Sequence, residues 1–565
     1  MIFSSWILFF LAIQVIHFFG TWRLYKAAGY KGWHAAVPVY NGFILMKIIK
    51  RPFWWVLLLF IPTVNLIVFG AIWIETLRSF GKNTIKDTFL GLASFGLYIY
   101  TINYSNKPIH IPNRDLRSKT GIGETLSSIL FAIVAATIVH NYVIQPYIIP
   151  TGSLEKSLLI GDFLFVSKFH FGARVPMTAV SVPMVHDTVP FLKIRSYLKN
   201  PQLPYLRLPA LQKIKRNDIV VFSWPADTVR QFFVREKRVD KPIDKKSNYV
   251  KRCLGIPGDT LEIINGFVHT NGVKNILPSR ARVQYTFNAF AKKGVSSRKL
   301  IAAGFEDFNR KYKIENITEN SYQKLVPHIV GRIGNTVEDF SVITKANGLP
   351  TKLIRQLGLR VSEILETNKE LTLTIVEANG LKSLEGIDSV KRRILKSKTS
   401  NETFFPNKIP FNWNEDNFGP LLIPKKGMTI SLTRDNLPLY KKIIQEYENS
   451  VLELTPTEIK INGLVRTEYT FKKDYYWMMG DNRHRSEDSR FWGFVPEDHI
   501  VGKPVFIWFS IKGINDGIKN WSIRWNRVFT TVDGPGERYS YFPFFIGFII
   551  VWQGFVFIRI GILNR

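Results

Sequence analysis

Four long stretches of the sequence contain no Asp, Glu, Lys or Arg, and they restrict the folds open to this chain more than any other feature. They cover residues 1–22, 52–74, 125–152 and 539–558. A helix needs about 20 apolar residues to cross a bilayer, so each stretch predicts a membrane-spanning helix. A shorter apolar stretch at 88–102 predicts a fifth span of marginal length. Buried helices of a soluble core are the alternative explanation for these stretches.

The loops between the apolar stretches carry charges that predict their orientation. Residues 21–51 hold only basic charges, and residues 107–124 hold more basic than acidic ones. Basic loops remain on the cytoplasmic side, so both loops are expected inside. Five spans then place everything after Tyr147 outside and return Arg559 and Arg565 to the inside. The N-terminus lacks the basic start and the small-residue exit of a cleaved secretory signal.

The formal net charge of the chain is +32, from 76 Lys and Arg against 44 Asp and Glu. Such an excess indicates an anionic partner, either nucleic acid or an anionic membrane face. The basic residues are spread along the chain without a nucleic-acid-binding motif, so no nucleic acid partner is predicted. The single cysteine, Cys253, excludes an intrachain disulfide and any multi-cysteine metal site.

Residues 147–537 form one long polar segment between the last two apolar stretches. Short runs rich in Val, Ile and Phe lie near both of its ends, separated by turn signals, and predict a mainly β body. Helix-like spacing of Leu, Ile and Val in the middle predicts an α/β insertion. The predicted parts are an N-terminal multi-span region 1–124, an anchor 125–146, a β domain in two pieces at 147–283 and 406–537, the insertion 284–405, and a C-terminal transmembrane helix 538–565.

A serine lies just beyond the third apolar stretch, where proline and glycine fix the backbone. Ser153 follows Pro150, Thr151 and Gly152, so a sharp and rigid bend presents its hydroxyl. A nucleophile needs such a fixed presentation, and the Thr151 hydroxyl is placed to stabilise a developing oxyanion. Taken alone, a plain loop that leaves the bilayer is the simpler interpretation of this segment.

A lysine in an apolar run is the candidate base. Lys251 precedes the tight turn at Pro257-Gly258, and apolar neighbours would lower its pKa by desolvation. A general base needs a pKa near the working pH. An exposed strand lysine is the ordinary alternative. Cys253 would point to the same side of a strand, and we interpret it as a small buried thiol rather than a second nucleophile.

A third segment, 479–496, is dense in charge and glycine but bounded by aromatic residues. Its charged side chains can neutralise one another and hold a loop in place. His484 and Asp488 could in principle complete a Ser-His-Asp triad with Ser153, although Lys251 has the better apolar setting. The ten histidines show no metal-ligand spacing, and no phosphate-binding loop occurs, so neither metal nor cofactor is expected.

Together these segments resemble the conserved boxes of the bacterial type I signal peptidases (leader peptidases), membrane-bound Ser/Lys serine endopeptidases. Pro-Thr-Gly-Ser at 150–153 resembles the nucleophile box, and Gly-Asp-x-x-x-Val-x-Lys at 161–168 resembles the strand after it. Lys-Arg-x-x-Gly-x-Pro-Gly-Asp at 251–259 resembles the lysine box. Gly-Asp-Asn-Arg followed by Ser-x-Asp-Ser-Arg-x-Trp-Gly-x-Val-Pro at 480–496 resembles the last box. The resemblance covers about 125–275 and 415–510.

The resemblance implies a role for each matching residue. Ser153 would be the nucleophile, Lys251 the general base and Thr151 the oxyanion donor. Ser486 would orient the lysine. Two structural ion pairs would join Asp481 with Arg252 and Asp488 with Arg490. The shallow pockets for the small P1 and P3 side chains of a signal peptide, bound as an added β-strand, would be lined by Ile149, Leu154, Leu158, Tyr249 and Val250.

The chain departs from the family pattern at three places. Leu154 replaces the usual methionine, Glu155-Lys156-Ser157 replaces a stretch that commonly contains proline, and His484-Arg485 replaces the usual Asp-Asn. These changes affect pocket shape and loop stability more than the Ser/Lys dyad. The insertion, the extra N-terminal spans and the C-terminal span lie outside the resemblance.

The leading hypothesis is therefore a signal peptidase I with a mainly β catalytic domain of signal-peptidase type. Its expected partners are the signal peptides of exported preproteins and the lipid bilayer, close to the protein-export machinery. The expected location is the cell (inner) membrane, with the catalytic domain on the outer (periplasmic) side. One alternative is a non-catalytic membrane protein of the same fold whose insertion binds a partner. A second alternative, a soluble Ser/Lys autoprotease linked to DNA damage, conflicts with the spans.

Overall fold

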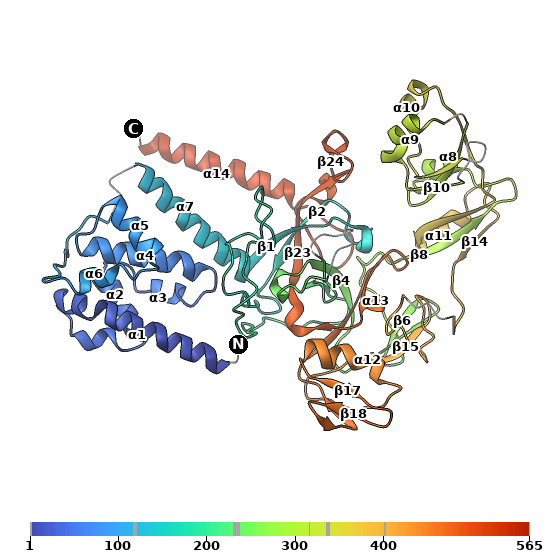
Figure 1. Cartoon of the computed structure of the whole chain (residues 1–565). Helices are drawn as coiled ribbons and strands as arrows, with labels where there is room; N and C mark the ends of the chain where they lie inside the picture. The colour runs from blue at the N-terminus through green and yellow to red at the C-terminus, as the bar shows by residue number, and fades with distance from the viewer. Residues whose placement is uncertain are drawn as a thin grey trace.

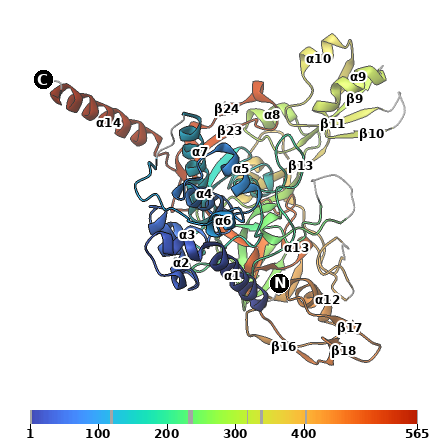
Figure 2. The ribbon, with the colours of Figure 1, turned by 60° about the vertical axis from the view of Figure 1, so that its left-hand side comes forward.

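The computed structural model describes residues 3–116, 121–229, 238–315, 317–334, 340–399, 403–408 and 410–563. A helical unit lies on one side of a central β body, and smaller lobes extend from the body on the other side (Figure 1). Figure 2 shows that the last helix, α14 (Phe542–Leu563), projects away from the body, with the C-terminus at its far end.

The helical unit is built around one apolar core that includes Leu24, Tyr25, Ile49 and Val64. Its helices are α1 (Phe3–Ala27), α2 (Tyr40–Ile48), α3 (Trp55–Leu58), α4 (Val64–Ser79), α5 (Ile85–Ala93) and α6 (Ile99–Asn103), followed by α7 (Gly121–Ile138). Within the described residues, three helices have the length and composition to cross a membrane: Ser4–Ala27, Gly121–Val143 and Phe542–Arg559. They contain most of three of the predicted apolar stretches.

The spans expected at 52–74 and 88–102 do not form continuous helices. The first is divided between α3 and α4, because Pro62 lacks an N–H and disfavours helical backbone in the residue before it. Thr63 then adopts a φ of +68°. The second is divided between α5 and α6, where Phe95 and Gly96 take φ angles of +51° and +84° that end a helix.

The β body is dominated by an antiparallel sheet with the strand order β1-β2-β23-β3-β4-β21-β22, and β24 and β25 add to β23. This arrangement confirms the mainly β prediction. The strands are β1 (Ile144–Ile148), β2 (Asp162–Ser167), β3 (Ile219–Ser223), β4 (Asn248–Gly255), β21 (Tyr475–Met479), β22 (Val495–Pro496), β23 (Ile500–Lys512), β24 (Ser522–Ile523) and β25 (Thr530–Thr531).

A second sheet packs beside the first, with the order β15-β5-β6-β7. Its core continues under the small strands and helices of the second piece of the body, around Trp477 and Phe494. These elements are β5 (Thr260–Ile264), β6 (Phe267–Thr270), β7 (Val273–Lys274), β15 (Phe418–Leu422), β16 (Thr429–Ser431), α12 (Leu437–Lys442), β17 (Leu452–Leu454), β18 (Ile459–Ile461), β19 (Leu464–Val465), β20 (Glu468–Thr470) and α13 (Ser489–Trp492).

The segment predicted as an α/β insertion contains both helices and strands, in two lobes with separate cores. The lobe nearer the body has the sheet order β13-β8-β14, from β8 (Gln284–Phe290), β13 (Asn368–Thr374) and β14 (Ser389–Arg392), with α8 (Ser297–Ala302) and α11 (Ile375–Lys382). The outer lobe has the order β10-β11-β9-β12, from β9 (Asn309–Glu315), β10 (Gly331–Ile333), β11 (Ser341–Lys345) and β12 (Arg360–Glu363), with α9 (Glu319–Leu325) and α10 (Thr351–Gln356).

Candidate active site

Ser153 and Lys251 meet in the β body, although 98 positions separate them in the chain. Lys251 Nζ donates a hydrogen bond of 2.7 Å to Ser153 Oγ. Ser153 retains 9% of its accessible surface and Lys251 only 4%. The nucleophile and the base that the sequence predicts therefore lie within direct proton-transfer distance, in a site largely shielded from water.

The serine is held by a single 3-10 turn, Gly152–Leu154, that follows β1. The turn is fixed to the last motif, because the backbone N–H of Asn482 donates to the Ser153 carbonyl at 3.0 Å and its side-chain amide donates to the Gly152 carbonyl at 3.1 Å. Asn482 was not singled out from the sequence. Its place inside the Gly-Asp-Asn-Arg motif was the available signal.

The lysine is delivered by β4, which lies between β3 and β21 in the main sheet. Burial lowers the Lys251 pKa to about 8, because the charged ammonium loses its hydration. The carboxylates of Asp488 and Glu487 oppose this shift, and Arg490 reinforces it. About a tenth of the lysine is therefore neutral at pH 7, far more than at its ordinary pKa, and the neutral amine is the form that a general base requires.

Both expected ion pairs are formed, and both are buried. The Arg252 guanidinium donates two hydrogen bonds, of 2.8 and 2.6 Å, to the Asp481 carboxylate. They join β4 to the end of β21. The Arg490 guanidinium likewise donates hydrogen bonds of 2.9 and 2.8 Å to the Asp488 carboxylate. Asp488 also accepts the backbone N–H of Gly480 at 3.0 Å. The pairs fix the last motif against the lysine strand, so the site is rigid on this side.

Gly480 lies where the serine turn and the last motif approach each other most closely. A Cβ atom at this position would collide with the Ser486 hydroxyl and the Ser153 carbonyl oxygen. The Ser486 side chain is buried, and its Oγ makes no hydrogen bond with the residues that the structure describes. Its predicted role in orienting Lys251 stays a prediction.

The predicted oxyanion donor, Thr151, is exposed on the surface just before the serine turn. Its backbone is extended, with φ −131° and ψ 155°, and no hydrogen bond joins its hydroxyl to the described parts of the chain. The hydroxyl is therefore available to a substrate carbonyl at this position. Its role stays a prediction.

The residues predicted to line the substrate pockets fall into two groups. Ile149, Leu154 and Leu158 are buried in the core beneath the serine turn, with 3% of their surface exposed at most. Tyr249 and Val250 are half-buried on β4. The Tyr249 ring stacks on Trp224 at a centroid distance of 5.0 Å, an aromatic contact that sequence reasoning missed. The three aliphatic side chains pack beneath the serine turn, and the predicted lining role of all five residues stays a prediction.

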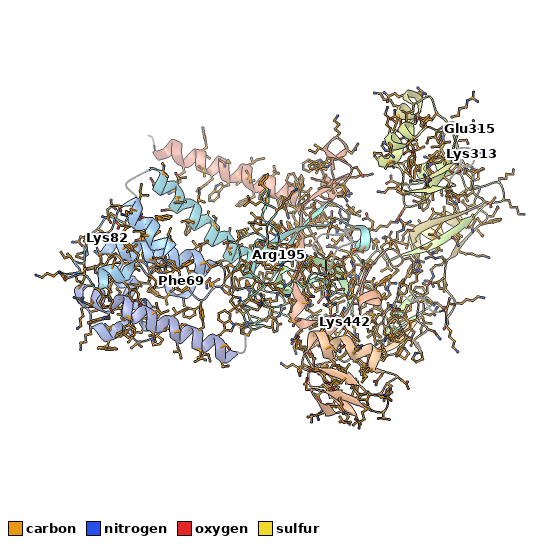
Figure 3. The ribbon with its side chains drawn as sticks, viewed as in Figure 1. Phe69, Lys82, Arg195, Lys313, Glu315 and Lys442 are labelled. Carbon is orange, nitrogen blue, oxygen red and sulfur yellow. The ribbon has the colours of Figure 1, made fainter. Side chains whose placement is uncertain are left out.

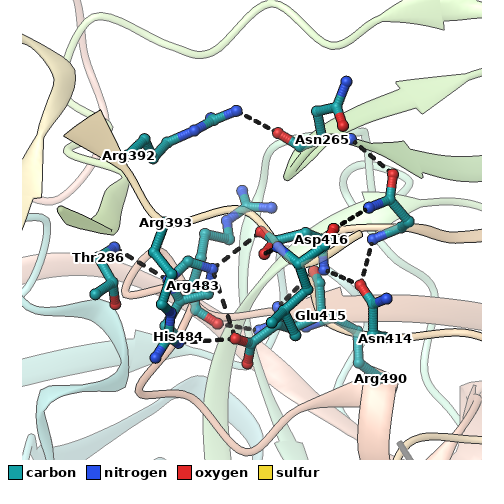
Figure 4. Close-up of polar contacts among 12 residues, drawn as sticks. Asn265, Thr286, Arg392, Arg393, Asn414, Glu415, Asp416, Arg483, His484 and Arg490 are labelled. Atoms are coloured by element: carbon teal, nitrogen blue, oxygen red, sulfur yellow. Dashed lines mark hydrogen bonds and ion pairs between the residues drawn. The ribbon is translucent and has the colours of Figure 1, made fainter. Parts of the chain in front are cut away.

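The alternative Ser-His-Asp triad is not formed. His484 lies where the lobe of β13-β8-β14 meets the body. Both of its ring nitrogens make polar contacts there (Figure 4). Nδ1 accepts the backbone N–H of Thr286 at 3.0 Å, and Nε2 lies 3.1 Å from Asp416 Oδ1. Glu415 completes a group with metal-ligand chemistry, but it accepts a hydrogen bond of 2.9 Å from Arg393. The cluster is thus a connection between lobe and body.

Cys253 is fully buried on β4, two residues beyond the lysine, and its thiol donates to the Gly255 carbonyl at 3.4 Å. Burial raises the pKa of the thiol, so the reactive thiolate is disfavoured. This agrees with the interpretation of Cys253 as a packed thiol.

Comparison with known proteins places these motifs in a family. A family model described as "Signal peptidase, peptidase S26" matches residues 122–328 and 422–509, more than half of the chain. The chain belongs to this signal peptidase family. Ser153, Lys251 and the last motif all lie within the matched segments. A model described as "Family of unknown function (DUF5684)" matches residues 33–111, within the helical unit.

Curated members of the signal peptidase family are similar to the chain over most of its length. The Signal peptidase I of Buchnera aphidicola (subsp. Schizaphis graminum) is 23% identical over 403 residues, which cover 70% of this chain and 78% of the relative. The Haemophilus influenzae enzyme of that name is 24% identical over 72% of this chain and 75% of its own length. The Helicobacter pylori enzyme is 23% identical over 72% and 92%.

Proposed function

We propose that the protein is a signal peptidase I, a membrane-bound serine endopeptidase that removes signal peptides from exported preproteins. The observation that carries the proposal is the hydrogen bond between Lys251 Nζ and Ser153 Oγ in a buried site. Family membership supports the reaction class, and the lowered pKa of Lys251 supports its role as base.

The geometry suits a two-step acyl transfer. Neutral Lys251 takes the hydroxyl proton as Ser153 Oγ attacks the scissile carbonyl carbon. The resulting oxyanion receives hydrogen bonds from the Thr151 hydroxyl and the Ser153 backbone N–H. Collapse of this intermediate breaks the C–N bond, and the lysine ammonium protonates the departing amine of the mature protein. Water, deprotonated by the same lysine, then hydrolyses the ester and restores the serine.

The helices support a membrane-anchored arrangement with the β body on the outer side. The N-terminal end of α1, the C-terminal end of α7 and the N-terminal end of α14 all adjoin the body (Figure 1). Trp6, at the start of α1, donates to the Gln202 carbonyl in the body at 3.0 Å. Arg51 and Arg114 both pair with Glu75 in the helical unit. Basic charge there is expected on the cytoplasmic side.

The decisive experiment is cleavage of a synthetic preprotein, with small residues at P1 and P3, by the full chain purified in detergent. Wild type is compared with Ser153→Ala and Lys251→Ala. The matched controls are Ser522→Ala and Lys441→Ala, which change exposed residues elsewhere in the body. We expect both site variants to lose several orders of magnitude in kcat/KM and both controls to keep wild-type activity.

Two outcomes would overturn the proposal. Cleavage by Ser153→Ala at the wild-type rate would show that Ser153 is not the nucleophile. An inactive wild-type chain, tested on several such preproteins, would favour the non-catalytic membrane protein whose insertion binds a partner.

A further inference from the structure

A polar cavity of about 160 Å³ lies where the helical unit, the end of α7 and the β body meet. Thr63 contributes from the α3–α4 turn, and His140 and Asn141 contribute from the last turn of the α7 span. The body contributes Lys168, at the end of β2, and residues of the long connection that follows. Arg174, Asp244 and Lys245 of the body also line the cavity.

The lining of this cavity carries more positive than negative charge. Lys168, Arg174 and Lys245 face one carboxylate, Asp244. That carboxylate is already occupied by the Thr178 hydroxyl at 2.7 Å and by two backbone N–H groups. Arg174 donates to the Asp498 carbonyl and the Ser223 hydroxyl, and Lys245 to the Val185 carbonyl, so neither has a carboxylate partner among the described residues.

Two buried polar groups of the lining have no partner in the described parts of the chain. Lys168 is 9% exposed, and its ammonium makes no hydrogen bond or ion pair there. The Thr63 hydroxyl, which the helical unit contributes to the lining, is likewise buried and makes no hydrogen bond there. Burial and the nearby guanidinium groups of Arg174 and Arg207 lower the Lys168 pKa to about 7. A buried cation without a partner is costly, and a bound anion would remove that cost.

The cavity is placed at the level expected for lipid headgroups. It adjoins the outer end of the α7 span, and the Trp6–Gln202 hydrogen bond ties the start of α1 to the same region. Residues 174–207 form a long hairpin beside it, paired at Arg174↔Arg207 and Thr188↔Arg195. Arg195, near the hairpin tip, lies at the junction of helical unit and body in Figure 3. The hairpin exposes large apolar side chains: Met184, Phe191, Leu192, Ile194, Leu198 and Leu206.

We propose that this cavity binds the phosphate of an anionic phospholipid headgroup, with the acyl chains against the apolar hairpin. Lys168 and Lys245 donate to the phosphate from the body, and the Thr63 hydroxyl donates from the helical unit. The lipid then joins the helical unit to the β body through a shared ligand. A basic pocket beside a membrane span is a recognised way of holding a lipid headgroup. The site is separate from the Ser153–Lys251 site, so it stands independently of the proposed peptidase activity.

Thermal unfolding of the full chain in detergent tests the proposal without any need for activity. The probes are short-chain phosphatidylglycerol, short-chain phosphatidylcholine and inorganic phosphate. Wild type is compared with Lys168→Met, and Lys213→Gln is the matched control because it removes an exposed lysine from the same β2–β3 connection. We expect phosphatidylglycerol to raise Tm of wild type and control, and to bind Lys168→Met about tenfold or more weakly, as the loss of a charge-assisted hydrogen bond predicts.

Each result supports or overturns the proposal. In the absence of lipid, Lys168→Met is expected to unfold at or above the wild-type temperature, because it removes a buried charge without a partner. That outcome also shows that the variant folds. An equal response of Lys168→Met and wild type to phosphatidylglycerol would overturn the site. An equal response of wild type to inorganic phosphate, or to phosphatidylcholine, would overturn an anionic lipid as the ligand.

Discussion

At the scale of single residues, the chemistry proposed for this chain depends on a lysine that the fold keeps out of water. Lys251 is buried on β4, and of the two carboxylates that favour its charged form, Asp488 and Glu487, the first is already paired with Arg490. The ammonium therefore gains little from ion pairing while it loses hydration. This balance, rather than the serine, sets the pH at which the dyad works.

The pH profile of kcat/KM follows from this balance. Lys251 acts as a base only when neutral, and its pKa is lowered to about 8. We expect kcat/KM to rise about tenfold per pH unit below that value and to level off above it. The measurement is initial-rate cleavage of a preprotein between pH 5 and 10 in one detergent. A profile that is flat through pH 8, or that falls as pH rises towards 8, would contradict the neutral-lysine mechanism.

A second prediction for a single residue concerns the close contacts at Gly480. Gly480→Ala forces a methyl group against the Ser486 hydroxyl and the Ser153 carbonyl, so the serine turn must shift. A displacement of this kind misaligns the nucleophile, and we expect kcat/KM to fall by about 10²-fold. Gly380→Ala is the control, because a Cβ there meets no other atom within 4 Å. Wild-type kinetics in Gly480→Ala would show that the close approach is unimportant.

At the scale of elements, the connection between β4 and the end of β21 depends on a buried pair. Arg252→Met leaves the Asp481 carboxylate buried without its cation, and we expect the free energy of unfolding to fall by about 3–5 kcal/mol. The double variant Arg252→Met, Asp481→Leu removes both charges and should recover part of this loss. Denaturant unfolding of wild type, of Arg252→Met, of Asp481→Leu and of the double variant forms a double-mutant cycle. Additive losses would mean that the two side chains do not interact.

The sequence predicted the β character of the body better than the helices of the apolar stretches. Turn residues and β-type runs near both ends of 147–537 predicted a mainly β body, because such patterns depend on neighbouring residues alone. The Ser153 and Lys251 boxes were found for a similar reason, since each is a short motif. Their 2.7 Å contact required the sheet, which brings β4 beside the serine turn.

The spans were predicted from the length of uncharged sequence, and that length does not show where a helix is interrupted. The stretch 52–74 has the composition of a span, but Pro62 and the positive φ at Thr63 divide it. Length and hydropathy do not register such local backbone constraints. Ile149, Leu154 and Leu158 were assigned to the substrate pockets by resemblance. The structure places their side chains in the core beneath the serine turn, and their role in lining a pocket stays a prediction.

At the scale of the whole molecule, the number of spans can be tested by labelling. The only cysteine, Cys253, is buried, so a single introduced cysteine reports without background. Lys82→Cys lies exposed between α4 and α5 (Figure 3). Three spans keep it inside, whereas five spans place it outside. We expect a membrane-impermeant maleimide to label Ser522→Cys in spheroplasts and to label Lys82→Cys only after permeabilisation. Labelling of Lys82→Cys in intact spheroplasts would restore the five-span arrangement.

The position of α14 has a mechanical consequence. The β body is continuous with α7 at its start and with α14 at its end, so it is fastened at two points. If α7 and α14 both cross the membrane, as proposed, the body cannot swivel freely and can only rock about the line between its two attachment points. That restraint would limit the range of distances between Ser153 and the lipid surface, and so the peptide bonds of a threaded preprotein that can reach the serine.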